Sequence, residues 1–360
     1  MIEIDGSMGE GGGAVLRTAL TLGAVSQRAV HIRNVRAKRD RPGLQPQHLS
    51  GVQALAKITK ARVEGVNLNS TEIEFEPGPI EGGRYHVDIG TAGSTTLILQ
   101  ILMPAAAFAD GPVDIEIRGG TDNSLAPSID FLKNVTFPTL RRMGYRGEVE
   151  CVRRGHYPRG GGIVRVRIEP VEKLQAVNLT DPGKLVKISG VAHAVRLPAQ
   201  IATRISHAAS IELIKHCQAR VDIKSESYQP TQDHHMGPGA GITLWAETES
   251  GAVIGASSLG APGKPSERVG REAAEAMTKQ LRTGMAVDRH TTDQLIPYMA
   301  LADGTSEITS TSLTPHTLTN IDLVEKILGV KFQVEGELGS PGKIAVKGLG
   351  LEKTRRLDKS

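Results

Sequence analysis

The chain has 360 residues, and its 43 Lys and Arg against 39 Asp and Glu give a formal net charge of +4. Aromatic residues make up only 3%, which excludes a platform of many stacked aromatics for single-stranded bases. The 2 cysteines exclude a cysteine-rich zinc site and a disulfide framework. At one domain per roughly 100 to 200 residues, the length predicts two or three domains.

The first residues lack the basic and apolar regions of a secretory signal. No uncharged apolar run reaches the roughly 18 to 20 residues that a membrane-spanning helix needs. We therefore expect a cytoplasmic protein with no membrane partner.

Two stretches of the chain have the same predicted order of elements, β-α-β-α-β-β. In the first, strands are predicted at residues 2–5, 30–35, 61–68 and 71–76, and helices at residues 14–25 and 47–59. In the second, strands are predicted at residues 85–89, 113–118, 145–152 and 162–168, and helices at residues 94–108 and 127–143. The common order predicts an internal repeat.

A third copy is predicted if about a hundred residues are lifted out of the chain. Its strands lie at residues 174–179, 306–311, 331–336 and 343–347, and its helices at residues 291–302 and 315–328. The intervening segment has predicted strands at 185–191 and 220–225, a hairpin at 242–257, and helices at 198–217 and 266–281. We expect an α/β (α+β) fold: a body of three repeated units, residues 1–183 and 284–350, with a smaller α+β domain, residues 184–283, inserted in the third unit.

The loop Gly9-Glu10-Gly11-Gly12-Gly13 joins a predicted strand to a predicted helix. Its glycines allow backbone N–H groups to approach an anion at the start of the helix. Glu10 would repel a phosphate unless a divalent cation lay between them, so Glu10 is a candidate metal ligand. Arg17, one to two turns into the helix, is a candidate phosphate contact. The alternative is a tight turn with a solvated carboxylate.

The densest positive segment follows the second strand. Five cations occur there within nine residues: Arg33, Arg36, Lys38, Arg39 and Arg41. Arg39 and Arg41 precede a Pro-Gly turn, where side chains fan outward toward phosphates. Gln47 and His48 begin the next predicted helix. The alternatives are a solvated basic loop and a structural His48.

A histidine near the C-terminus has the setting of a nucleophile. Thr314 and Pro315 predict the N-cap and the first residue of a helix, which places His316 in its first turn. The helix dipole there disfavours imidazolium and leaves a neutral, nucleophilic ring. Asp293, on the preceding predicted helix, is placed to accept the other ring N–H. The alternative is a capping or surface histidine.

Other polar segments do not by themselves indicate a catalytic or binding role. Gln100 lies on the inner part of a predicted helix, where a satisfied core amide is the plain alternative. The segments 119–123 and 156–162 are interpreted as polar turns. His234 and His235 lie in a Gly- and Pro-rich stretch, which favours a loop over a metal site.

Taken together, these motifs resemble the RNA 3′-terminal phosphate cyclase family along nearly the whole chain. The residues that carry the resemblance are Gly9-Glu10-Gly11-Gly12-Gly13, Arg41-Pro42-Gly43-Leu44 with Gln47-His48-Leu49, Gly119-Gly120-Thr121-Asp122-Asn123, Tyr157-Pro158 before Gly160-Gly161-Gly162, Asp293-Gln294-Leu295, and His316 with Leu318-Thr319-Asn320-Ile321. The family's body has three β-α-β-α-β-β units, similar to those of enolpyruvyl transferases and of an initiation-factor domain, with a smaller inserted domain.

The resemblance implies ATP-dependent conversion of an RNA 3′-phosphate into a 2′,3′-cyclic phosphodiester, with release of AMP and pyrophosphate. A histidine, here His316, attacks the ATP α-phosphorus; AMP passes to the RNA 3′-phosphate, and the vicinal 2′-hydroxyl displaces it. Glu10 would hold Mg²⁺ or Mn²⁺. Arg39 and Arg41 would hold the RNA phosphate, with Gln47 and His48 nearby.

The resemblance also implies a nucleotide pocket. The residues expected to bind the nucleotide are Gln100, Asp293, Gln294, Glu10 and Arg17, with Pro127 and Phe131 near the base. Where bacterial relatives place a tyrosine against adenine, this chain has His290, whose imidazole can also stack.

Two other classes of protein remain as alternatives. A ribosome-assembly branch of the same fold binds or acts on RNA without adenylation, but it lacks the nucleophilic histidine that His316 supplies. An enolpyruvyl-transferase-like enzyme would bind phosphorylated small molecules, which leaves the basic segment at residues 33–41 unexplained.

Overall fold

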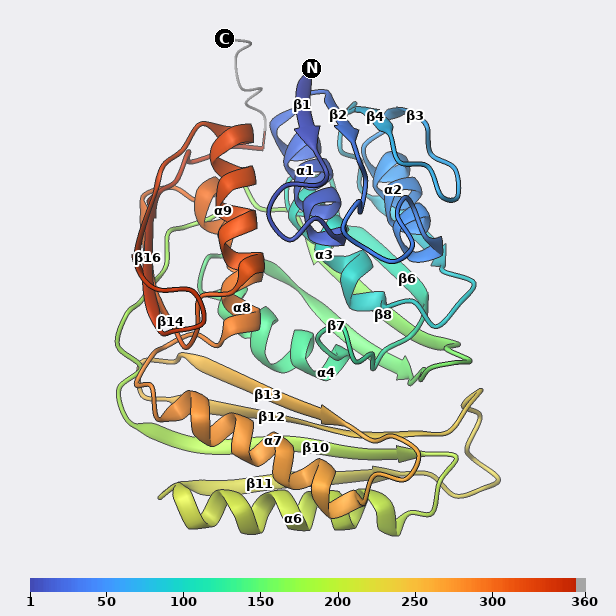
Figure 1. Cartoon of the computed structure of the whole chain (residues 1–360), viewed down its shortest axis with the longest axis vertical. Coiled ribbons are helices and arrows are strands. Elements are labelled where there is room, and N and C mark those ends of the chain that lie inside the picture. Colours follow the sequence, from blue (N-terminus) through green and yellow to red (C-terminus); the bar gives the residue numbers. More distant parts are fainter. Residues whose placement is uncertain (354–360) are drawn as a thin grey trace.

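The structure is a computed structural model that describes residues 1–353. In that part of the chain, helices pack against four mixed sheets of four strands each, so the predicted mixed α/β class is confirmed (Figure 1). None of the helices that the structure describes is long and apolar enough to cross a bilayer.

The first sheet has the order β1-β2-β4-β3, in which only β1 and β2 run parallel. Its strands are β1 (Ile2–Asp5), β2 (Val30–Arg33), β3 (Arg62–Glu64) and β4 (Ile73–Glu76). The helices α1 (Gly13–Ser26) and α2 (Pro46–Ile58) connect them. Nearly every side chain of α1 is buried, because the apolar run from Ala14 to Val25 is enclosed by neighbouring helices.

Two further sheets have the same strand order. The second sheet contains β5 (Gly83–Asp88), β6 (Val113–Gly119), β8 (Gly162–Glu169) and β7 (Arg146–Arg153), in that spatial order. The third contains β9 (Asn178–Leu179), β14 (Thr305–Ser310), β16 (Gly342–Lys347) and β15 (Phe332–Gly336). In each of the three sheets the first and second strands in chain order are parallel and the other pairs are antiparallel.

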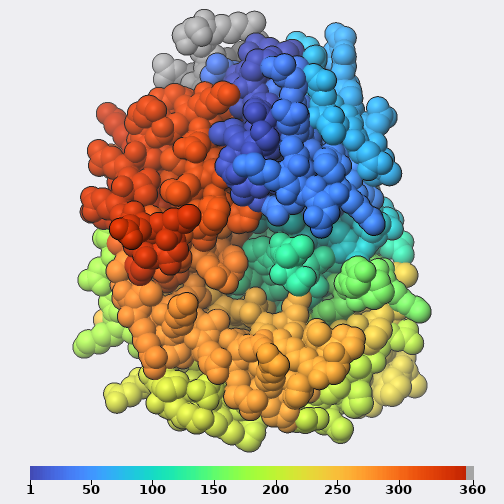
Figure 2. Space-filling model, viewed as in Figure 1, coloured from blue at the N-terminus to red at the C-terminus, as the bar shows by residue number. Residues whose placement is uncertain are grey.

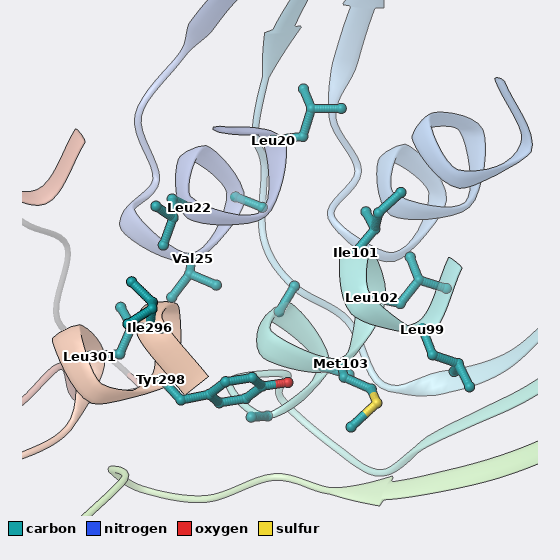
Figure 3. Close-up of a cluster of buried hydrophobic side chains, with 14 of the residues drawn as sticks. Leu20, Leu22, Val25, Leu99, Ile101, Leu102, Met103, Ile296, Tyr298 and Leu301 are labelled. Carbon is teal, nitrogen blue, oxygen red and sulfur yellow. The ribbon is translucent and has the colours of Figure 1, made fainter. Parts of the chain in front are cut away.

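Three helices, one associated with each of these sheets, pack together in one core (Figure 3). They are α1, α3 (Thr95–Ala106) and α8 (Arg289–Leu301). Leu22 of α1, Ile101 and Met103 of α3 and Ile296 of α8 are each at most 2% exposed. Burying each such side chain stabilises the fold by about 1.5 to 3 kcal/mol, so the junction of the three helices is firmly packed.

The fourth sheet lies between β9 and α8 in the chain. It has the order β11-β10-β12-β13 and is built from β10 (Leu185–Val195), β11 (Arg220–Ser227), β12 (Gly239–Thr248) and β13 (Val253–Leu259), with α6 (Gln200–His216) and α7 (Ser266–Leu281) packed against it. This segment has its own apolar cluster and forms the lower end of the molecule in Figure 2. The division of the chain at residues 184 and 283 stays a prediction.

One predicted helix is interrupted. Residues 127–143 form α4 (Ile129–Phe131), a π-helical turn (Leu132–Thr136) and α5 (Phe137–Arg141) instead of one α-helix. Pro138 has no N–H to donate to the carbonyl four residues earlier, which explains why the regular hydrogen-bond pattern fails there. The predicted strand 174–179 is likewise reduced to the two residues of β9.

Candidate active site

The glycine-rich loop between β1 and α1 is held against two other segments. Gly9 and Gly11 have φ of 54° and 58°, a left-handed conformation that favours glycine. A Cβ on Gly9 would overlap Thr319 of helix α9 (Pro315–Leu328), and one on Gly11 would overlap Lys38. The backbone N–H of Glu10 donates to Oγ1 of Thr319 at 3.2 Å. The glycines therefore permit the close approach that carries Glu10 to the start of α9.

Glu10 lies between a guanidinium and an imidazole. Its side chain is 9% exposed, and its Oε2 accepts a hydrogen bond from Nη2 of Arg39. Its Oε1 lies 3.7 Å from Nδ1 of His316. Both of these atoms are buried and have no hydrogen-bond partner among residues 1–353. A buried polar atom without a partner costs about 1 to 3 kcal/mol, so this pair marks a place where a ligand would be stabilising.

The start of α9 is fixed by a capping network. The side chain of Thr314 accepts from the N–H of Thr317, and Pro315 occupies the first turn. His316 follows, with its side chain 45% exposed. The predicted helix start at Pro315 and end at Leu328 are confirmed.

Asp293 belongs to this capping network. Its Oδ1 accepts from the hydroxyls of Thr314 at 2.6 Å and Thr317 at 2.5 Å. Burial raises the pKa of Asp293, and the two hydroxyl donors oppose that shift. Within the described residues, the Asp293 side chain contacts the start of helix α9 and not the imidazole of His316. The expected hydrogen bond from His316 to Asp293 therefore stays a prediction.

A cavity of about 620 Å³ adjoins His316. Its lining includes seven of the residues predicted for nucleotide binding, Arg17, Gln100, Pro127, Phe131, His290, Asp293 and Gln294, but not Glu10. They come from α1, α3, the segment leading into α4, and α8, and the inserted segment adds Lys264. All three units of the body thus contribute to one cavity.

An aromatic wall closes part of the cavity. The rings of Phe131 and His290 meet edge to face, with centroids 5.9 Å apart. Burial, assisted by Arg289, lowers the pKa of His290 to about 4. The imidazole is therefore neutral at pH 7 and presents a flat, uncharged surface.

Several cations gather at the start of α1. A Cβ on Gly13 would lie 2.7 Å from Nε2 of His48 and 2.9 Å from Nη1 of Arg17, so both side chains contact this helix end. Burial lowers the pKa of Arg17 to about 10, which still leaves it charged at pH 7. Burial and the nearby guanidinium groups lower the pKa of His48 to about 3. Together with Arg39, this end of α1 carries the positive charge that an anion requires.

The other residues predicted to contact RNA have different surroundings. Arg41 is exposed, and its carbonyl accepts from Nη1 of Arg36 at 2.7 Å, a contact that shapes the basic loop. Oε1 of Gln47 accepts from the backbone N–H of Ser94 at 2.6 Å, which ties α2 to the N-cap of α3. Arg39 and His48 lie beside the Glu10 end of the site, whereas Gln47 has a structural contact. Their roles toward RNA stay predictions.

Asn320 was quoted in the sequence motif but given no role. Its Nδ2 donates to the carbonyl of Asp293 at 2.9 Å, and its Oδ1 accepts from Thr18 at 2.8 Å, so it joins α9 to α8 and α1. The signal was its spacing: Asn320 follows His316 by four residues, which places both on one face of α9.

The fold and site define a mixed α/β protein with a cavity lined in part by the helices α1, α3 and α8. The sequence profile described as RNA 3′-terminal phosphate cyclase matches residues 8–334, so the chain belongs to the RNA 3′-terminal phosphate cyclase family. Relatives named RNA 3′-terminal phosphate cyclase include one from Methanopyrus kandleri, 50% identical over 96% of this chain and 99% of the relative. Others come from Ignicoccus hospitalis, 47% identical over 97% and 99%, and Pyrococcus furiosus, 45% identical over 96% and 98%.

Proposed function

We propose that this chain converts the 3′-terminal phosphate of RNA into a 2′,3′-cyclic phosphodiester, consuming ATP and releasing AMP and pyrophosphate. The family and the names of the relatives support the RNA cyclase activity. One observation carries the adenylation chemistry: Nδ1 of His316 and Oε1 of Glu10 face each other without partners beside a cavity large enough for a nucleotide.

The reaction begins on His316. Because Nδ1 faces the Glu10 carboxylate, we assign the ring proton to Nδ1 and the free lone pair to Nε2, so Glu10 and not Asp293 is the partner of the ring N–H in this proposal. Nε2 attacks the α-phosphorus of ATP, and the bond to pyrophosphate breaks as the P–N bond forms. A phosphate oxygen of the RNA end then attacks the same phosphorus, which breaks the P–N bond and restores the imidazole. Finally, the 2′-hydroxyl attacks the 3′-phosphorus, loses its proton and displaces AMP.

The residues present fit a divalent cation at Glu10. Oε1 is a buried carboxylate oxygen with no donor, the kind of ligand that Mg²⁺ and Mn²⁺ take in proteins. A bound cation would supply positive charge against the triphosphate. Arg39, which donates to the other oxygen of Glu10, holds the carboxylate in place.

The cavity supports a division of roles. We place the adenine base by Phe131, His290 and Pro127, and the rest of AMP by Gln100 and Gln294. The charged end of α1 then receives phosphate groups at Arg17 and His48. Arg39 and Arg41, on the exposed basic loop, are assigned to the RNA end.

Incubation with α-labelled ATP and a divalent cation, followed by denaturing electrophoresis, tests the proposal. We expect protein-bound label that is discharged by RNA ending in a 3′-phosphate and not by the same RNA ending in a hydroxyl. An absence of covalent label with intact protein, at any metal concentration, would contradict the adenylation chemistry.

A second test concerns the metal. Glu10→Gln keeps the shape of the side chain but removes the charge, so adenylation should need a roughly 10- to 100-fold higher metal concentration. The measurement is a Mn²⁺ titration of initial labelling rates, with Glu3→Gln, an exposed carboxylate on β1, as the control. Unchanged metal dependence in Glu10→Gln would remove Glu10 from the metal site.

A further inference from the structure

A second set of unpaired polar atoms lies between the second sheet and the inserted segment. Asp122 follows β6, His156 lies in the loop between β7 and β8, and His193 is on β10. One ligand atom from each lies within 4.8 Å of the other two. Their side chains are 0%, 7% and 1% exposed. We call these three residues the buried triad.

The atoms of the buried triad face one another without hydrogen bonds. Oδ1 of Asp122 lies 3.9 Å from Nε2 of His193, and Oδ2 of Asp122 lies 3.9 Å from Nε2 of His156. These separations are too long for hydrogen bonds. Among residues 1–353, Oδ1 of Asp122, Nε2 of His156 and both ring nitrogens of His193 are buried and have no hydrogen-bond partner. Only one nitrogen of His193 can face the other two residues, so three ligand atoms meet here, and leaving them unpaired would cost several kcal/mol.

The surroundings orient the triad. Oδ2 of Asp122 accepts from the hydroxyl of Thr121 at 2.6 Å, which leaves Oδ1 turned toward His193. Nη1 of Arg154 lies 3.6 Å from Oδ2, but the same guanidinium is also paired with two other carboxylates, Asp130 and Glu226, at 2.7 Å each. Its positive charge is therefore neutralised by those partners and does not prevent a cation from binding.

Strand β12 leaves room for the two rings. A Cβ on Gly239 would overlap the ring of His156, and one on Gly241 would lie 3.0 Å from Cε1 of His193. Burial lowers the pKa of His156, and it lowers the pKa of His193 to about 3. A metal would bind through the ring nitrogens that have no hydrogen-bond partner among the described residues, Nε2 of His156 and one nitrogen of His193.

We propose that Asp122, His156 and His193 bind one Zn²⁺ ion. Two imidazole nitrogens and one carboxylate oxygen are donors that zinc takes, whereas Mg²⁺ and Ca²⁺ prefer oxygen alone. Zinc bonds of about 2.0 to 2.2 Å in a tetrahedron place ligand atoms about 3.4 Å apart. The three ligand atoms lie within 4.8 Å of one another, so a shift of about 1 Å or less by each side chain would bring them to zinc distances. The fourth position would take water.

The consequence of this site is a tether between two parts of the chain. Asp122 and His156 belong to the second unit of the body, and His193 belongs to the inserted segment. Asn123, next to Asp122, lines the cavity beside His316. A zinc ion would therefore hold the inserted segment and one wall of the cavity in a fixed relation, independently of whether the proposed adenylation occurs.

The test is the metal content of the full chain. Protein stripped with a chelator, reloaded with Zn²⁺ and separated from free metal should hold one zinc per chain. His193→Gln should bind at least about 100-fold more weakly, since even changes outside the ligand set cost roughly 10- to 100-fold. The matched control is His216→Gln, a surface histidine of α6 beside Glu212 in the same inserted segment, which should keep one zinc. Equal zinc in His193→Gln and the parent chain would overturn the proposal.

A second measurement covers the case in which His193→Gln does not fold. In the parent chain alone, Zn²⁺ should raise the unfolding temperature by at least about 3 °C, and Mg²⁺ at the same concentration should not. Co²⁺ loaded in place of zinc should give the strong visible absorption of a tetrahedral site. A parent chain that retains no zinc and unfolds at the same temperature with and without it would rule out the site.

Discussion

The Glu10–His316 pair and the buried triad share one property and differ in another. In both, carboxylate and imidazole atoms face each other at 3.7 to 3.9 Å without a hydrogen bond between them. His316 is 45% exposed and adjoins a cavity of about 620 Å³, whereas His193 is 1% exposed. The exposure of the first place suits a ligand as large as a nucleotide, and the burial of the second suits an ion.

The substitution His316→Ala should have the largest effect, and it should affect the Glu10–His316 pair without affecting the buried triad. Loss of the nucleophile should reduce covalent labelling from α-labelled ATP by about 10⁴-fold or more, because no other group can form the P–N bond. The zinc content should stay that of the parent chain. Variants of His48 and His290 serve as controls for the labelled position. Label that persists in His316→Ala and disappears in one of those controls would move the nucleophile.

A smaller effect is expected from the basic loop. Arg41→Ala should still form the enzyme–AMP adduct but transfer AMP to RNA about 10- to 150-fold more slowly, the loss of one charged hydrogen bond of about 1.5 to 3 kcal/mol. Rates of adduct formation and discharge, measured separately, check this. The control is Arg33→Ala, which also removes one positive charge, from an arginine that is paired with Glu3. It should leave the rates of adduct formation and discharge nearly unchanged. A defect already at self-adenylation would place Arg41 at the ATP phosphates.

The cavity wall should also respond to pH. The pKa of His290 is about 4 in the folded chain, against about 6.5 when unfolded, so the unfolded state binds more protons between these values. Stability from this residue is full above pH 6.5 and is lost as pH falls toward 4. Because His290 is exposed to solvent, this loss is smaller than the pKa shift alone would give. The unfolding free energy of His290→Gln, measured with denaturant across this pH range, should fall less with decreasing pH than that of the parent chain. His31, whose pKa Glu3 raises, should show the opposite sign.

The smallest effect concerns the cap of α9. Thr314→Ala removes the N-cap acceptor and one of the two hydroxyls that donate to Asp293, so it should cost about 1 kcal/mol of unfolding free energy. Thr305→Ala, at an exposed position, should stay within about 0.5 kcal/mol. Equal stability of the two variants would mean that α9 starts without help from Thr314.

Local signals in the sequence predicted most elements. The bounds of α7 and α9 were predicted to the residue, in α9 because Thr314 and Pro315 mark its start and Gly329 its left-handed end. The interruption near Pro138 was missed, since a single proline in an apolar periodic run is compatible with either a first-turn position or a break.

Part of the candidate site could also be predicted from the sequence, and part could not. The family resemblance, and not a local pattern, predicted residues that line the cavity, such as Gln100 and Phe131. The meeting of Glu10 with His316, and of Asp122 with His193, depends on how separate units pack. Such pairs leave no local pattern, because no spacing in the sequence reports a contact between strands or loops far apart in the chain.

The position of the inserted segment has a consequence for folding. Strand β9 pairs with β14 through residues such as Leu179 and Ile308, and hydrogen bonds between these strands span 129 residues. Closing so long a loop is slow and entropically costly. Because the inserted segment has its own apolar cluster, it can collapse first and shorten the flexible part to roughly a quarter, worth about 1 kcal/mol of closure entropy. The third sheet, and with it the helix that presents His316, would then assemble last, so that a newly made chain acquires its nucleophile only after the rest of the molecule is in place.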